Sequence, residues 1–163
     1  MLAPLIQHEN LFPILSSRLP KLLPKTSQTL HPMPVFEARV LVVEDDAALR
    51  RLLTMLLERE NYYVVAVANG AEAVSTFAQY AFDLILMDIM MPMMDGLSAC
   101  AHIRTHSAVP IILLSAFSSA EIKAKAKNSG ASHFLHKPIR PKELKQQLQQ
   151  FLSKPVHSKC DDS

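Results

Sequence analysis

The sequence is poor in features that mark secreted and membrane proteins. Its two cysteines, Cys100 and Cys160, form no Cys-x-x-Cys pair and no disulfide framework. No apolar run approaches the roughly 20 residues that a membrane-spanning helix needs. We therefore expect no membrane span and a reducing, cytoplasmic location, with Cys100 as a small core residue.

A concentrated basic surface is also missing. The formal net charge is +2, and residues 37–153 hold twelve basic and twelve acidic side chains. The only local basic cluster is Lys123, Lys125 and Lys127, which we interpret as a solvated helix face. Nucleic-acid readers usually carry a basic stripe beside an element that enters a groove. We therefore expect no direct binding of nucleic acid.

Residues 1–36 form a proline-rich leader. Six of the eleven prolines fall within the first 34 residues, and each removes a backbone donor and restrains the residue before it. The apolar pieces between them are too short for a signal-peptide core. We expect this leader to be disordered, with a targeting segment or a true start at Met33 as alternatives. Residues 154–163 form a polar tail.

Between these ends, continuous apolar runs alternate with helical patterns. The apolar runs fall at 40–43, 62–67, 84–87, 111–114 and 132–135. The helical patterns cover the leucines at 49, 52, 53, 56 and 57, the segment capped by Asn69, 96–106, 119–128 before Gly130, and the stretch from Pro141 to 152. Strands that are apolar throughout belong to a parallel sheet covered on both faces. The sequence thus predicts a doubly wound α/β fold with five parallel strands and five helices.

Polar side chains follow four of the five predicted strands. Glu44, Asp45 and Asp46 come after the first strand, and Asp88 after the third. Ser115 ends the fourth strand, and Lys137 stands just past the fifth. In such sheets ligands bind outside the carboxyl ends of the strands. These side chains are therefore expected to meet at one rim.

The chemistry of this set favours phosphoryl transfer. Close carboxylates repel one another unless a cation neutralises them, and an all-oxygen site suits Mg²⁺, with Mn²⁺ as an alternative. Lys137 supplies a positive charge and the Ser115 hydroxyl a hydrogen bond for an incoming anion. Asp88 is then the phosphoryl acceptor. Asp46, just before a helical pattern, is interpreted as a helix cap.

Four stretches carry a resemblance to a known family. The run Asp88-x-x-Met91-Pro92-x-x-Asp95-Gly96, the acids after the first strand, the segment ending in Ser115-Ala116 and the pair Lys137-Pro138 strongly resemble the receiver domain of two-component response regulators. The similarity extends from Arg39 to about Ser153, so we assign residues 37–153 to a receiver domain. It implies a flavodoxin-like sheet with strand order 2-1-3-4-5.

The resemblance implies a role for each rim residue. Asp88 would be the phosphoacceptor and Asp45 a direct ligand of the metal. Glu44 would assist through water, and the backbone carbonyl of Met90 would complete the protein's share of the metal ligands. Lys137 would pair with the phosphoryl group.

It also implies a switch. Ser115 would move to bond the phosphoryl group while the Phe134 ring turns inward, and a cis peptide would precede Pro138. Met90 and Phe117 fill two positions that influence hydrolysis of the aspartyl phosphate in this family. Neither can orient a water through a strong hydrogen bond, so we predict slow self-dephosphorylation.

The sequence therefore predicts a phosphorylation-activated signalling domain rather than an enzyme. The phosphodonor would be a histidine kinase or a phosphotransfer protein, and the downstream protein target is unknown. Only ten residues follow Ser153, so we expect a single-domain regulator that acts by binding a partner near Phe134. The alternatives are a receiver fragment of a hybrid kinase and a phosphorylation-independent binding module. An aspartyl-nucleophile hydrolase would need a second Asp where Met90 stands.

Overall fold

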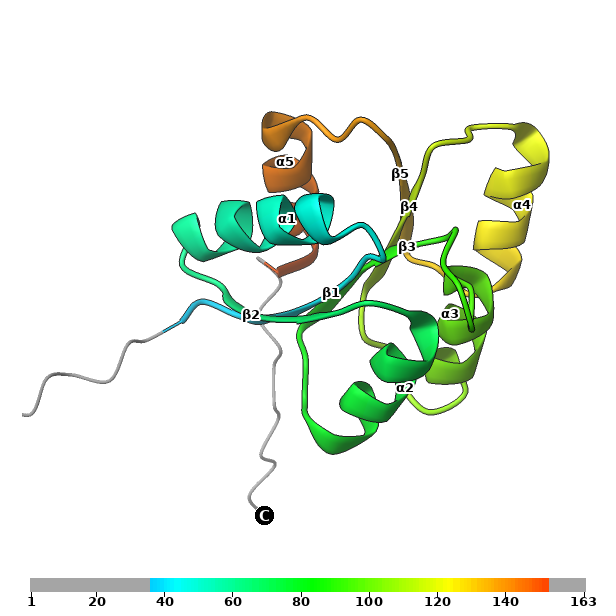
Figure 1. The fold of residues 1–163 in the computed structure, drawn as a ribbon, viewed down its shortest axis with the longest axis horizontal. Coiled ribbons are helices and arrows are strands. Elements are labelled where there is room, and N and C mark those ends of the chain that lie inside the picture. The colour runs from blue at the N-terminus through cyan, green and yellow to red at the C-terminus, as the bar shows by residue number, and fades with distance from the viewer. Residues whose placement is uncertain (1–35, 153–163) are drawn as a thin grey trace, which may run out of the picture. The chain divides into compact units, whose positions relative to one another are not determined.

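A computed structural model describes residues 36–152 of the chain, which contain five strands and five helices in strict alternation (Figure 1). In chain order they are β1 (Arg39–Val43), α1 (Ala47–Arg59), β2 (Tyr63–Val67), α2 (Gly70–Gln79), β3 (Leu84–Asp88), α3 (Gly96–Arg104), β4 (Ile111–Ser115), α4 (Ala120–Asn128), β5 (His133–His136) and α5 (Pro141–Leu152). All the paired strands are parallel, in the order β2-β1-β3-β4-β5. The predicted fold and strand order are confirmed.

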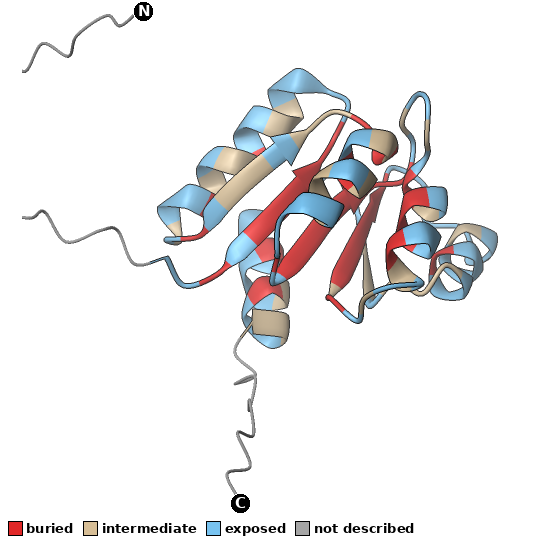
Figure 2. Ribbon diagram, turned by 90° about the horizontal axis from the view of Figure 1, so that it is seen from below, coloured by how far each residue is buried: buried red, intermediate tan, exposed pale blue. Residues whose placement is uncertain are grey.

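The sheet separates two hydrophobic cores. Helices α1 and α5 cover one face, where Leu53 and Leu57 pack with Leu144 and Leu148, and helices α2, α3 and α4 cover the other (Figure 1). The inner strands β1, β3 and β4 are buried almost throughout, as Figure 2 shows in red. Each large aliphatic side chain removed from water contributes about 1.5–3 kcal/mol, which explains why these strands are apolar on both faces.

Short polar caps set where the helices begin. Asp46 Oδ1 accepts a hydrogen bond from Leu49 N at 2.8 Å and starts α1, as predicted. Asn69 Oδ1 accepts from Glu72 N at 2.9 Å and starts α2. Glu72 reaches back to the backbone N–H of Ala68 rather than that of Asn69, which makes this a variant of the capping box.

The turn between β3 and α3 depends on a very close approach of two backbone segments. A Cβ atom placed on Gly96 would lie 2.0 Å from the carbonyl oxygen of Asp88, so no other residue fits there. The amide of Gly96 also donates to Ile89 O at 2.9 Å. Three residues earlier, Met93 takes a positive φ of 68°, which an L side chain rarely adopts. This turn fixes the path of the chain directly after Asp88.

Several local expectations are confirmed and some are not. Cys100 is fully buried, and burial raises the pKa of its thiol. Lys123, Lys125 and Lys127 are exposed, in agreement with a solvated helix face. Leu52, however, shares the apolar periodicity of α1 yet is 50% exposed, because it lies beyond the stripe that faces the sheet.

The predicted leader and tail fall largely outside the described residues, as do Met33 and Cys160. Within residues 36–152, no helix has both the length and the hydropathy of a membrane span.

Candidate functional site

Strand pairing brings the predicted acids together at the carboxyl edge of the sheet. β1 and β3 are neighbours, with Val43 opposite Met87, so Glu44 and Asp88 follow at the same level. β4 and β5 follow on the other side of β3, and the amide of Lys137, just past β5, donates to Ser115 O at the end of β4 at 2.8 Å. Sequence positions 44, 88, 115 and 137 therefore converge at one rim, as predicted.

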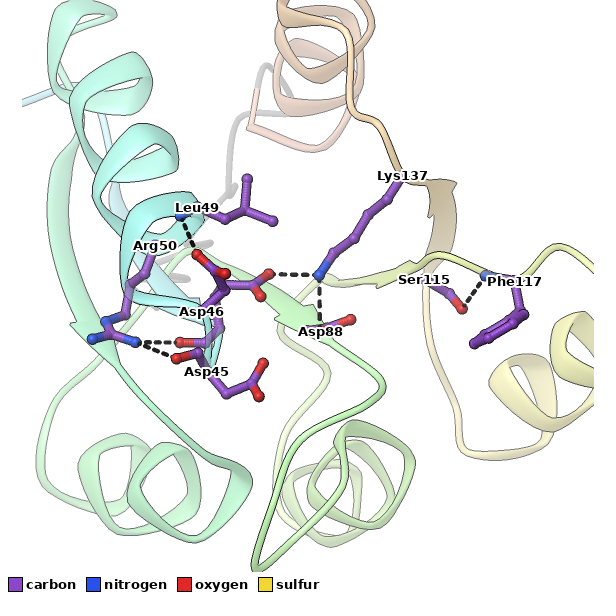
Figure 3. Close-up of polar contacts among 9 residues, drawn as sticks. Asp45, Asp46, Leu49, Arg50, Asp88, Ser115, Phe117 and Lys137 are labelled. Carbon is purple, nitrogen blue, oxygen red and sulfur yellow. Dashed lines mark hydrogen bonds and ion pairs between the residues drawn. The ribbon is translucent and has the colours of Figure 1, made fainter.

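Lys137 links the two buried acids of this rim (Figure 3). Its Nζ lies 2.8 Å from Glu44 Oε2 and 2.9 Å from Asp88 Oδ2. The Glu44 residue is 1% exposed and Asp88 is 5% exposed. The peptide bond between Lys137 and Pro138 is cis, as the resemblance implied.

Burial and charge change the acid–base properties of this pair. Burial raises the pKa of Glu44 above its ordinary value, although the Lys137 hydrogen bond opposes the shift. Burial alone would lower the pKa of Lys137, but its hydrogen bonds to Glu44 and Asp88 outweigh that effect and raise it. A further cation beside Glu44 and Asp88 would favour the ionised form of Glu44, because it offsets the burial and the neighbouring negative charge.

The acids form a group with the chemistry of a divalent-metal site. Carboxylate oxygens of Glu44, Asp45 and Asp88 lie within 4.8 Å of one another. When all three carboxylates are ionised, the one ammonium of Lys137 leaves two negative charges in excess. Oxygens that ligate one Mg²⁺ at about 2.0–2.1 Å lie at most about 4.2 Å apart, so a small inward movement would bring this set to bonding distance.

The cluster opens to a cavity of about 650 Å³ at the surface. Asp45 is exposed, whereas Glu44 and Asp88 lie at the base, so an anion can approach Asp88 from solvent. Leu49 and Leu52 of α1 line the same cavity, which accounts for the exposure of Leu52. Asp46 also lines it, but its Oδ1 caps α1.

Arg50 is a site residue that the sequence analysis did not identify. Its Nη1 donates to the backbone carbonyls of Glu44 at 2.6 Å and Asp45 at 3.1 Å (Figure 3). These bonds tie the acid-bearing loop to the first turn of α1. The signal available in the sequence was an arginine six residues after Glu44, which by itself does not distinguish a loop clamp from a solvated side chain.

The side chain of Ser115 is directed away from Asp88. Its hydroxyl oxygen accepts a hydrogen bond from Phe117 N at 3.0 Å, inside the loop between β4 and α4 (Figure 3). Ser115 is 1% exposed, whereas Phe117 is 60% exposed. The carbonyl of Ala116 in this loop contacts the His136 ring at 3.0 Å. The structure thus brings Ser115 to the correct strand end but not into contact with the acids.

Two further predicted residues lie near the rim. Met90 stands two residues after Asp88 with its side chain 58% exposed, and the role of its backbone carbonyl stays a prediction. Phe134 is a partly buried residue of β5 that packs against the core shared with α2, α3 and α4. Its switching role also stays a prediction.

The family model described as the response regulator receiver domain matches residues 40–149 of the chain. Those residues contain the whole acid cluster, Ser115, Phe134 and Lys137.

Curated relatives share the same stretch. The transcriptional regulatory protein ResD of Bacillus subtilis is 42% identical over 108 residues, which cover 66% of this chain and 45% of ResD. The DNA-binding response regulator MtrA of Mycobacterium bovis is 36% identical over 112 residues, which cover 69% of this chain and 49% of MtrA. The chain therefore spans about half the length of these relatives.

A solved structure also matches. The receiver domain of the sensor histidine kinase PA1611 from Pseudomonas aeruginosa, described with a magnesium ion coordinated in its active-site cleft, superposes with a TM-score of 0.68. It is 32% identical, and the match covers 72% of this chain and 98% of that one.

These relatives correct one expectation. The prediction of no direct nucleic-acid binding is wrong, because MtrA is named a DNA-binding response regulator and shares this domain. The prediction was drawn from the neutral charge of residues 37–153, which describes the surface of that domain alone. The ten residues after Ser153 do not support that prediction either, because ResD and MtrA are about twice as long as the region that matches this chain.

Proposed function

Because this chain belongs to the response regulator receiver domain family, we propose that Asp88 accepts a phosphoryl group from a phosphohistidine. The donor would be a histidine kinase or a phosphotransfer protein, and a kinase that uses ATP places the reaction in the cytoplasm. An Asp88 carboxylate oxygen attacks phosphorus as the bond between phosphorus and the histidine nitrogen breaks. The histidine leaves as a neutral imidazole after it gains a proton.

One observation carries the proposal. Lys137 Nζ lies 2.9 Å from Asp88, so an ammonium already stands where charge on the phosphoryl oxygens would develop. The bond to Glu44 holds the Lys137 side chain in that place. Such positioning of charge supplies most of the catalysis in phosphoryl transfer.

The acid cluster would hold the metal. Asp45 and Asp88 would bind Mg²⁺ directly, with Glu44 acting through water and Met90 through its backbone carbonyl. When bound, Mg²⁺ neutralises negative charge on the cluster and on the incoming phosphoryl oxygens. The donor set fits this ion because it consists of oxygens alone.

The output would come from Ser115 and Phe134. A phosphoryl group on Asp88 offers the Ser115 hydroxyl proton a charged acceptor, so Ser115, whose oxygen accepts from Phe117 N, moves to donate a hydrogen bond to a phosphoryl oxygen. The β4–α4 loop follows, and the ring of Phe134 moves into the space that is vacated. A partner then recognises the changed surface near Phe134.

The protein would act as a signalling domain and not as a turnover enzyme. It accepts one phosphoryl group and hydrolyses it slowly. Met90 stands two residues after Asp88, and Phe117 stands two residues after Ser115. Both side chains are exposed and offer no strong donor or acceptor to an attacking water.

The test is incubation with acetyl phosphate and Mg²⁺, followed by intact mass spectrometry. We expect one added phosphoryl group on the native chain and none on Asp88→Asn. The matched control is Asp46→Asn at the same rim, which keeps a good helix cap and should label normally. Normal labelling of Asp88→Asn, or of the native chain in excess chelator, would contradict the proposal.

A further inference from the structure

Two histidines at the end of α3 face a common groove, at the opposite end of that helix from the turn that follows Asp88. His102 and His106 are both exposed, and their ring centroids lie 6.1 Å apart at an interplanar angle of 40°. Both line a cavity of about 310 Å³ whose remaining walls include Val74 and Phe77 of α2. The rings therefore share one space instead of pointing into solvent in different directions.

The backbone keeps helical spacing across the pair, although α3 ends at Arg104. Thr105 has helical dihedral angles, with φ −64° and ψ −20°. Ile103 O accepts from His106 N, three residues on, at 3.0 Å and from Ser107 N, four residues on, at 3.1 Å. Side chains four residues apart on such a backbone are neighbours on one face. This spacing of two histidines recurs in zinc sites on helices.

The separation of the rings suits one shared ion. A zinc–nitrogen bond of about 2.0–2.1 Å puts the metal about 3.2 Å from the centroid of each ligating ring, so the two centroids lie at most about 6.4 Å apart. The observed 6.1 Å falls inside this limit but corresponds to an angle of about 145° at the metal, so the centroids must approach to about 5.2 Å for a tetrahedral angle. Small rotations of the exposed rings would then close the angle at the metal.

A hydrogen-bond chain fixes which nitrogen of His106 is available. The Thr105 hydroxyl donates its single proton to the backbone carbonyl of His102 at 2.7 Å. Its oxygen also lies 2.6 Å from Nδ1 of His106. Because that proton is already used, the second contact is a hydrogen bond from Nδ1–H of His106 to the Thr105 oxygen. Neutral His106 therefore carries its proton on Nδ1 and presents a lone pair at Nε2.

Ligating histidines in metal sites commonly show this arrangement, in which the other ring nitrogen donates to an oxygen and so orients the ring. The ring of His102 makes no hydrogen bond to any residue of 36–152, and both its nitrogens stay available.

We propose that His102 and His106 bind one divalent transition-metal ion of the Zn²⁺ or Ni²⁺ type, with water in the remaining coordination positions. Imidazole nitrogens select these ions over Mg²⁺, whereas the oxygen-only cluster at Asp88 is of the type that suits Mg²⁺. The two sites therefore differ in ligand chemistry as well as in place. Thr105 is a positioning residue that holds the His106 ring in its ligating tautomer.

The experiment is calorimetric titration of the full chain with Ni²⁺ in excess Mg²⁺, which competes with Ni²⁺ at the acid cluster. The chain has seven histidines, so variants must locate the site. We expect His102→Ala and His106→Ala each to weaken binding by at least about tenfold. His136→Ala is the matched control, since that ring contacts Ala116 O on another element, and it should bind as the native chain does.

A second variant separates positioning from folding. Thr105→Val keeps the shape of the side chain but removes its hydroxyl, and we expect affinity to fall by about tenfold with an unchanged melting temperature. Amide signals of residues 102–106 should broaden first on addition of paramagnetic Ni²⁺. Native affinity in both histidine variants, or broadening that spares this segment, would overturn the proposal.

Discussion

At the carboxyl edge of the sheet, an acceptor half (Glu44, Asp88 and Lys137) lies beside a responder half (Ser115 and Phe117). The acceptor half is joined internally, since Lys137 contacts both acids within 2.9 Å. In the responder half, Ser115 bonds to the backbone of its own loop. Chemistry needs groups fixed in advance, whereas a switch needs a group that can exchange one partner for another. The difference between the halves therefore matches a division between accepting and responding.

The two halves also differ in the cost of rearrangement. Separating Lys137 from its acids would leave buried charges unpaired, which costs about 3–5 kcal/mol. Releasing Ser115 from Phe117 N breaks one neutral hydrogen bond, which contributes about 1 kcal/mol. Releasing the Ser115 hydroxyl therefore costs less free energy than separating Lys137 from its two acids.

The largest expected effect concerns the close backbone approach between Gly96 and Asp88 of the acceptor half. Gly96→Ala puts a Cβ atom 2.0 Å from the Asp88 carbonyl and should destabilise the protein by about 3 kcal/mol or more. Gly130→Ala is the matched control beyond α4, where φ is 86° and the nearest atom, Arg104 Cγ at 2.7 Å, belongs to a side chain instead of the backbone. It should cost about 1–2 kcal/mol. Urea unfolding followed by circular dichroism measures the free energy of unfolding of both variants. Equal losses would show that the turn after Asp88 tolerates a side chain as well as the Gly130 position does.

A smaller effect concerns Mg²⁺ as an addition to the acceptor half. Free Mg²⁺ at about 100 times its Kd should stabilise the native chain by about 2.7 kcal/mol, because the ion binds a cluster that exists only in the folded protein. Asp45→Asn should lose most of this gain, and Asp46→Asn should keep it because its side chain caps α1. Thermal unfolding with and without Mg²⁺ checks the prediction, which fails if both variants respond alike.

The third prediction concerns Met90, two residues after Asp88 of the acceptor half, and Phe117 of the responder half. Replacing Met90 by Asn and Phe117 by Glu supplies groups that can orient a water for attack on phosphorus. We expect the double variant to lose its phosphoryl group about tenfold faster, equivalent to about 1.4 kcal/mol in the barrier. The measurement is the decay of phosphorylated Asp88 after the phosphodonor is removed. Equal or slower decay in the double variant would show that the native lifetime has another cause.

The smallest effect concerns a strained point in the turn that follows Asp88. Met93→Gly relieves the positive φ of 68° but adds flexibility to the unfolded chain. We expect these opposing effects to raise the free energy of unfolding by about 0.5 kcal/mol. Met90→Gly, in the same loop without a positive φ, should instead destabilise the protein. A lower melting temperature for Met93→Gly would count against strain at this position.

Much of this architecture follows from the sequence alone. The apolar runs that became β1, β3 and β4 predict buried parallel strands because each is hydrophobic on both faces. The positions of Asp88 and Lys137 then follow, since parallel strands end at one edge. Asp46 was identified as a cap because local spacing decides capping.

Other features depend on contacts between distant segments. Leu52 is exposed because it lies beyond the stripe of α1 that packs on the sheet, and the clamp from Arg50 onto Glu44 O follows from the fold of the β1–α1 loop. The shared groove of His102 and His106 needs α2 as its second wall. None of these is a property of spacing along one element.

By itself the sequence determined the strand order through its family pattern, the set of acids and the identity of the cation that joins them. Only the tertiary structure decided that Lys137 contacts Glu44 and Asp88 together while Ser115 bonds to Phe117 N. Local pattern fixes which strand end a residue occupies, because it depends on neighbours in the chain. The direction of a side chain at that end depends on partners up to 93 positions away, and only packing brings these together.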